Sequence, residues 1–199
     1  MEKCDFNLAA DIAADCASMS VKGQGNRGWI MNFDDVDRET SKVDSSNPSL
    51  LTSLVLNTGA KAYNVYVPGS TPFTGTVKTF VKGTYINTWN KDVHLVILNE
   101  GPDVCNDIID KLANGRFVMV LENKTSGAGG KATYEVYGYE AGLTASEMSN
   151  DKYSEETNGG YAATLQETGA NKSGMFLYAT SLAATKAALE SLVNPPAAT

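Results

Sequence analysis

Histidine and cysteine are scarce in this chain of 199 residues, which has one histidine and three cysteines. Cys4, Cys16 and Cys105 make an odd number and contain no C-x-x-C pair, so they fit neither a disulfide framework nor a zinc ribbon. We expect them to be reduced thiols. A single imidazole without an identifiable nucleophile is weak support for catalysis. We therefore expect His94 to be a structural residue of a buried strand.

Long apolar runs and an excess of basic side chains are also missing. No run approaches the roughly 20 apolar residues of a membrane-spanning helix, and acidic residues stand where a signal peptide has its apolar segment. Lys and Arg number 16 against 23 Asp and Glu, a formal net charge of −7. This charge argues against a protein that grips nucleic-acid phosphates. We expect a protein made and kept in the cytoplasm unless something else carries it out, with no membrane partner.

The composition that remains is typical of strands and turns. Hydrophobic residues make up 42% of the chain, which also has 18 Gly and 9 Tyr. At this length roughly 70% of the unfolded surface can be buried, so no disulfide or metal is needed for stability. We predict an N-terminal arm over residues 1–27, helical at best in part, and one β-rich domain over residues 28–199.

Alternating and apolar segments predict more strands than helices. The expected strands cover residues 28–33, 50–56, 61–67, 76–86, 93–98, 117–121, 132–139 and 160–168. Turn chemistry at residues 57–60 predicts that the second and third of these form a hairpin. Helices are expected from Pro102 to Asn114, with Val104, Ile108, Ile109 and Leu112 inward, and from about Ser181 to Asn194. The fold class is therefore mainly β (α+β), a β-sandwich or partly closed barrel with a packed helix and a C-terminal helix.

The glycine-rich segment at residues 127–131, which ends in Gly130 and Lys131, is the most tempting ligand site. A phosphate-binding loop needs Gly where Thr125 stands, Ser or Thr where Ala132 stands, and a helix after the loop. A strand is expected to follow instead. We interpret the segment as the loop of a β-hairpin.

Two groups of carboxylates were considered as metal or catalytic sites. Hard oxygen ligands for calcium could come from a run of acids, but the run lacks the central Gly and the closing Glu of an EF-hand loop. Its members are Asp34, Asp35, Asp37 and Glu39. Asp103, Asp107 and Asp110 are spaced as the wet side of an amphipathic helix. We therefore predict no catalytic residues, no metal, no cofactor and no enzymatic activity.

Sheet edges offer the first positive suggestion of function. Several strands are expected beside extended polar loops, at residues 68–75 and 140–158. Exposed strand edges pair readily with other chains unless they are covered. We therefore expect the protein to assemble with copies of itself.

Several segments together resemble the tube proteins of bacteriophage tails, in particular those from phages of Bacteroides-like hosts. They are the pair Cys4 and Cys16, the strand running into residues 32–37, residues 114–124, residues 134–143, and a terminal strand that begins at residues 159–161. The resemblance spans most of the chain, and it consists of spaced hydrophobic and glycine patterns rather than a catalytic signature.

The resemblance implies a β-sandwich subunit of the virion tail that closes into hexameric rings, which stack into a tube. The implied partners are other copies of the chain, other phage tail or connector proteins, and genomic DNA passing transiently and without sequence specificity. A lumen of negative charge lets phosphates slide, whereas Lys and Arg would retain them. The extended loops would then make the contacts between rings.

Two alternatives remain open. A capsid decoration protein or a head-tail connector or terminator protein could show the same pattern, and a decoration module could bind a capsid or a glycan through Tyr134, Tyr137 and Tyr139. The other alternative, ranked last, is a small hydrolase using Asp34, Asp35 or His94.

Overall fold

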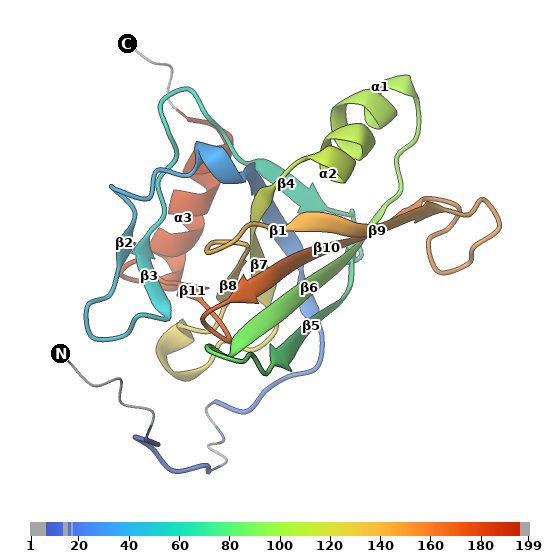
Figure 1. The fold of residues 1–199 in the computed structure, drawn as a ribbon. Helices are drawn as coiled ribbons and strands as arrows, with labels where there is room; N and C mark the ends of the chain where they lie inside the picture. The colour runs from blue at the N-terminus through green and yellow to red at the C-terminus, as the bar shows by residue number, and fades with distance from the viewer. Residues whose placement is uncertain (1–6, 14–15, 17, 196–199) are drawn as a thin grey trace.

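The computed structural model describes residues 7–13, 16 and 18–195, which form a sandwich of two β-sheets with helices at its periphery (Figure 1). It is not a closed barrel, so of the two predicted forms the sandwich is confirmed. The described residues before position 24 form neither helix nor strand, and Cys4 lies outside the described part of the chain. None of the described helices is long and apolar enough to cross a membrane.

The larger sheet has seven strands and the smaller has four. In spatial order the larger sheet contains β2 (Lys42–Val43), β3 (Leu50–Ser53), β11 (Phe176–Leu177), β8 (Tyr134–Tyr137), β7 (Phe117–Asn123), β1 (Gln24–Asn32) and β4 (Tyr63–Tyr66). The smaller sheet contains β5 (Phe73–Val81), β6 (Thr88–Ile97), β10 (Tyr161–Ala170) and β9 (Thr144–Asn150).

Two apolar clusters lie on the two faces of the larger sheet, and β7 contributes to both. Val118 and Val120 point to the outer cluster, while Met119 and Leu121 point between the sheets. All four are fully buried. Because both faces of this strand are covered, it shows as a continuous apolar run in the sequence rather than as an alternating one.

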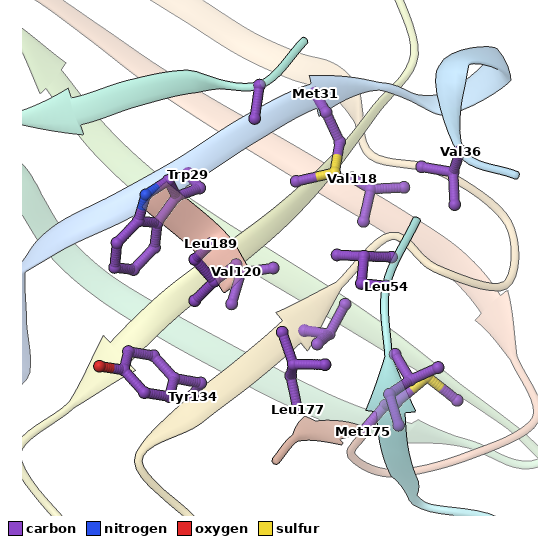
Figure 2. Packing of buried hydrophobic residues seen from close by; sticks show 13 residues of the cluster. Trp29, Met31, Val36, Leu54, Val118, Val120, Tyr134, Met175, Leu177 and Leu189 are labelled. Atoms are coloured by element: carbon purple, nitrogen blue, oxygen red, sulfur yellow. The ribbon is translucent and has the colours of Figure 1, made fainter. Parts of the chain in front are cut away.

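The C-terminal helix α3 (Leu182–Val193) covers the outer face of the larger sheet. The hydroxyl of Ser181 caps it by accepting a hydrogen bond from the backbone N–H of Ala184 (3.1 Å). Figure 2 shows Leu189 of this helix beside Trp29 and Val120 in the outer cluster. The predicted C-terminal helix is therefore confirmed, together with its start.

The predicted helix near residue 102 is also present, but its phase changes along its length. It consists of α1 (Pro102–Val104), the π-helical turn η2 (Cys105–Ile109) and α2 (Asp110–Asn114). A π turn adds a residue, which rotates the side chains that follow. Ile108, predicted to face inward, is instead 39% exposed.

The predicted hairpin between residues 50–56 and 61–67 is wrong. β3 pairs with β2 and β11, whereas β4 pairs with β1 at the far side of the sheet. The turn itself exists, with the N–H of Ala60 donating to the carbonyl of Asn57 (3.0 Å). The turn predicted at residues 57–60 is therefore present, but the strands beside it do not pair with each other. β4 joins β1, while β3 joins the nearby β2 and the distant β11.

The segment predicted as a polar loop over residues 140–158 contains a full strand, β9. Its side chains are mostly polar and none is fully buried, because it lies at the edge of the smaller sheet. By contrast, the glycine-rich loop is confirmed as the connection of an antiparallel pair, β7 and β8. Gly127, Gly129 and Gly130 all adopt positive φ there, which favours glycine.

Candidate functional site

The most distinctive surface of the protein is the outer face of the smaller sheet, which we call the open face. Buried Val93 and Leu95 point inward from β6, while Asp92 and His94, which alternate with them, point outward and are partly exposed. The strand registers place the following side chains on the same outward side: Val77, Thr79, Asn90, Asp92, His94, Val96, Ala162, Thr164, Gln166, Thr144, Glu147 and Ser149.

Hydrogen bonds between neighbouring strands order this face. The Nδ1 atom of His94 lies 2.9 Å from Oγ1 of its register partner Thr164. In the next outward-facing residue pair of the same two strands, Nε2 of Gln166 donates to Oδ1 of Asp92 (2.7 Å). His94 is thus part of a cross-strand ladder, half exposed rather than in the fully buried setting that we expected. Its hydrogen-bond partner is the hydroxyl of a threonine.

Positive charge is directed away from the open face. Among the four strands of the smaller sheet, whose residues are all described, the basic residues are Lys78 and Lys91. Both point inward and form ion pairs, with Glu135 and Glu167 respectively. The open face therefore carries the carboxylates of Asp92 and Glu147 and no Lys or Arg. Such a face repels phosphate groups rather than retaining them.

The pair formed by Lys91 and Glu167 is almost completely buried, with side chains 3% and 0% exposed. The Nζ atom of Lys91 donates to Oε2 of Glu167 at 3.0 Å. Backbone N–H groups at Gly138, Glu140 and Ala141 donate to the same carboxylate at 3.0–3.1 Å. Both carboxylate oxygens of Glu167 therefore accept hydrogen bonds, and these bonds tie the turn after β8 to the smaller sheet.

The second inward lysine belongs to a partly buried network between the sheets. Glu135, whose side chain is 7% exposed, accepts from Lys78, from the hydroxyl of Tyr137 (2.9 Å) and from Asn123 (3.3 Å). Burial, followed by the charge of Glu135, raises the pKa of the Tyr137 phenol far above its ordinary value. This tyrosine therefore remains a neutral hydrogen-bond donor at physiological pH.

Two long, unpaired edges bound the open face. β5 and β9 are the terminal strands of the smaller sheet, with nine and seven residues. Every neighbouring pair in this sheet is antiparallel, so with four strands the two edges run in opposite directions. Among the described residues, each edge strand has a strand partner on one side only and presents backbone N–H and C=O groups on the other.

The acidic run is occupied by local structural contacts. Asp34 forms an ion pair with Arg116 (2.9 Å), and Asp35 accepts from the side-chain amide of Asn32 (2.8 Å). Asp37 accepts from backbone N–H groups of its own turn, and hydrogen bonding to Thr40 lowers the pKa of its carboxyl. In the part of the chain that the structure describes, no three His, Cys, Asp or Glu side chains could hold a metal ion together.

The remaining sequence candidates lie on the helical segment and on or just after β8. Asp103, Asp107 and Asp110 are exposed on the helical segment, as expected for its wet side. The binding surface expected from Tyr134, Tyr137 and Tyr139 is not formed, because Tyr134 and Tyr137 are 3% and 1% exposed and Tyr139 packs, partly buried, against the outer cluster. Tyr134 and Tyr137 point to opposite faces of β8, and both faces are buried. Aromatic strand residues of that kind stabilise the core.

A deep cleft opens at one end of the sandwich. It has a volume of about 1320 Å³ and lies between β4, the end of β6 and the helical segment. Partly exposed apolar side chains line it, including Tyr63, Tyr66, Leu98 and Ile108. We call it the end cleft. Sequence reasoning missed it because three segments distant in the chain form its walls.

Sequence reasoning also missed the buried Lys91 and Glu167. A signal was present, since both residues stand in phase with the inward apolar positions of their strands, Val93 and Leu165.

Compared with known proteins, the chain matches no family model, and neither a curated protein nor a solved structure shows significant similarity to it.

Proposed function

We propose that the protein is a virion structural subunit of a bacteriophage tail tube, which closes into hexameric rings that stack to form the conduit for genome ejection. In this proposal β9 of each subunit pairs with β5 of its neighbour, and the open face lines the lumen. Other tail or connector proteins bind the ends of the tube, and DNA passes through it without being held.

The observation that carries the proposal is the pair of oppositely directed edges on the smaller sheet. A rotation that brings β9 of one copy beside β5 of the next continues the antiparallel order without a break. Head-to-tail contacts of this kind close into rings when the rotation closes. Such a ring also removes the exposed edges, which are a hazard to an isolated subunit.

The dimensions of such a ring suit a conduit. Six copies of a four-stranded sheet supply a barrel with a circumference of roughly 115 Å at 4.8 Å per strand, and thus a backbone diameter of about 37 Å before strand tilt widens it. Barrels of 16–18 strands already enclose an aqueous channel. The open face, free of Lys and Arg, then provides a wall that phosphates slide along.

Negative-stain imaging of the concentrated protein tests the proposal directly, and we expect rings and tubes. A protein that sediments as a monomer at high concentration while keeping its fold would contradict it. A particle map that places the chain on the phage head would instead favour a capsid decoration protein.

Amide hydrogen exchange tests how the ring closes. We expect the outward amides of β5 and β9 to gain protection on assembly, because they become paired with a neighbouring copy. The edge strand β2 belongs to the other sheet and serves as the internal control. Protection confined to β2, with β5 and β9 unchanged, would reject this mode of closure.

A further inference from the structure

The turn joining β5 to β6 projects apolar side chains into solvent. Tyr85 is 97% exposed and Ile86 68% exposed, and Lys82 is exposed beside them. We call residues 82–87 the hairpin tip. In the described part of the chain these two side chains belong to neither apolar cluster, and adjacent exposed apolar side chains of this kind favour contact with a partner.

The hairpin tip has a fixed shape. A Cβ atom added to Gly83 would collide with the carbonyl oxygen of Ile86, so only glycine allows the chain to fold back this tightly. The N–H of Gly83 also donates to Oδ1 of Asn87 (3.3 Å). Behind the tip, Phe80 and Trp89 pack edge to face with ring centroids 5.6 Å apart. The tip therefore presents Tyr85 and Ile86 on a preorganised base.

The end cleft lies at the opposite end of the same hairpin. β5 begins at Phe73 and β6 ends at Ile97, with Pro72 and Ile97 in the wall of the cleft, whereas the tip follows Val81. Strands of nine and ten residues separate the two features by roughly 30 Å at 3.3 Å per residue. The hairpin tip and the end cleft therefore lie at opposite ends of the hairpin formed by β5 and β6, along its strand direction.

Charge favours the same match. The hairpin tip carries a single charged side chain, Lys82. Asp107, Asp110 and Lys111 line the end cleft, which leaves an excess of one carboxylate there. An inserted tip would bring its ammonium group toward these carboxylates and its apolar side chains toward Leu98 and Ile108.

We propose that the hairpin tip of one copy of the protein inserts into the end cleft of the next copy along the strand direction, with Tyr85 and Ile86 as the anchoring side chains. The contact joins two different surfaces, so it repeats without closing and generates a stack. This inference rests on the proposed function, in which β5 and β9 close the ring and the hairpin tip joins one ring to the next.

Variants at both surfaces separate stacking from ring closure. We expect the double variant Tyr85→Ser with Ile86→Asn, and separately Ile108→Glu in the cleft, to form single rings but no tubes. Tyr153→Ser is the matched control, since Tyr153 is 95% exposed on a different hairpin and should leave tubes unchanged. Tubes of normal length from both tip and cleft variants would overturn the inference, while loss of tubes in the Tyr153 variant alone would assign the contact to another hairpin and also overturn it.

Disulfide trapping tests the contact even if rings never form. In a background in which Cys4, Cys16 and Cys105 are each replaced by serine, one batch carries Tyr85→Cys and a second carries Ile108→Cys. Under mild oxidation we expect a cross-linked dimer in the mixture. Either batch alone should give at least about tenfold less, because it lacks the second cysteine of the contact between tip and cleft. Equal cross-linking in all three samples, or none in the mixture, would show that a second copy does not occupy the cleft this way.

The two experiments distinguish the failure of each proposal. Rings without tubes in the wild-type protein, and no cross-link in the mixture, would reject the inference while leaving ring closure intact. A cross-link in the mixture without rings would reject ring closure by β5 and β9 but support insertion of the tip. Circular dichroism of each variant confirms that the fold is retained, as expected for substitutions at exposed positions.

Discussion

Lys91 and Glu167 are register partners on adjacent antiparallel strands, and their side chains meet inside the sandwich with Nζ and Oε2 3.0 Å apart. The inward direction of Lys91 has two consequences. It places a charge in the core that only Glu167 neutralises, and it keeps a positive charge off the open face. The same pair therefore matters for stability and for the surface that we propose lines the lumen.

Removing the lysine should destabilise the fold strongly. We expect Lys91→Met to lower the free energy of unfolding by about 3 kcal/mol, because the buried carboxylate of Glu167 loses its counter-charge. Urea denaturation monitored by circular dichroism measures the change. Lys152→Met is the control, since its ion pair with Glu100 is about half exposed and its loss should cost less than about 1 kcal/mol. Equal effects of the two substitutions would contradict the structural role of the buried pair.

Alkaline pH should weaken the fold through Tyr137. Its phenol titrates near 10.0 when exposed, but burial and the charge of Glu135 raise the pKa in the folded protein. Above pH 10 the unfolded chain loses this proton first, so the folded state binds more protons and stability falls as pH rises, by up to about 1.4 kcal/mol per pH unit for this group. Well below pH 10 the phenol is protonated in both the folded and the unfolded state, so the contribution of Tyr137 to stability is fully present there.

Tyr137→Phe tests this pH dependence. We expect unfolding free energies measured between pH 9 and 11 to decline less steeply in this variant than in the wild-type protein. Tyr85→Phe, at an exposed position, should leave the slope unchanged. An identical slope for all three proteins would show that Tyr137 does not control alkaline stability.

A lysine on the open face should make the assembled protein retain DNA. We expect Glu147→Lys, at an exposed position of β9, to leave assembly largely intact while slowing ejection, because each added phosphate contact brings salt-dependent retention. Ejection rates from particles that carry the variant, measured at two salt concentrations, provide the readout. Glu155→Lys makes the same change of charge in the loop after β9 and should have no effect. Ejection at the wild-type rate from assembled Glu147→Lys tubes would argue against a lumen position.

The C-terminal helix should depend strongly on Leu189 for its attachment to the larger sheet. Leu189 is fully buried in the outer cluster, so we expect Leu189→Ala to cost about 2–5 kcal/mol of unfolding free energy. Leu182→Ala, at a position 38% exposed on the same helix, should cost much less. Thermal or urea unfolding provides the comparison. A similar loss in both variants would mean that helix propensity, rather than packing against the larger sheet, sets the cost.

The elements that the sequence predicted well are those with strong local signals. The apolar run of β7, the helix that begins after Ser181 and the glycine-rich turn before β8 were all recognisable, because burial on both faces, capping and positive φ each leave a local pattern. The edge strand β9 was missed because an edge position imposes little apolar alternation on its residues. The sequence indicated that some strand edges would be free to pair with other chains, but it did not show that β5 and β9 form those edges.

The sequence by itself determined a mainly β chain with scarce histidine and cysteine, an excess of acid and segments able to form a sandwich, because composition and periodicity act locally. Only the tertiary structure decided which strands pair, since β3 and β4 flank a good turn yet do not pair with each other; β3 joins β11 and β4 joins β1. It also decided where the charges point, because inward or outward direction depends on strand register. The inward Lys78 and Lys91 follow from that register, whereas the exposed edges of β5 and β9 follow from the strand order and the end cleft from the packing of segments distant in the chain.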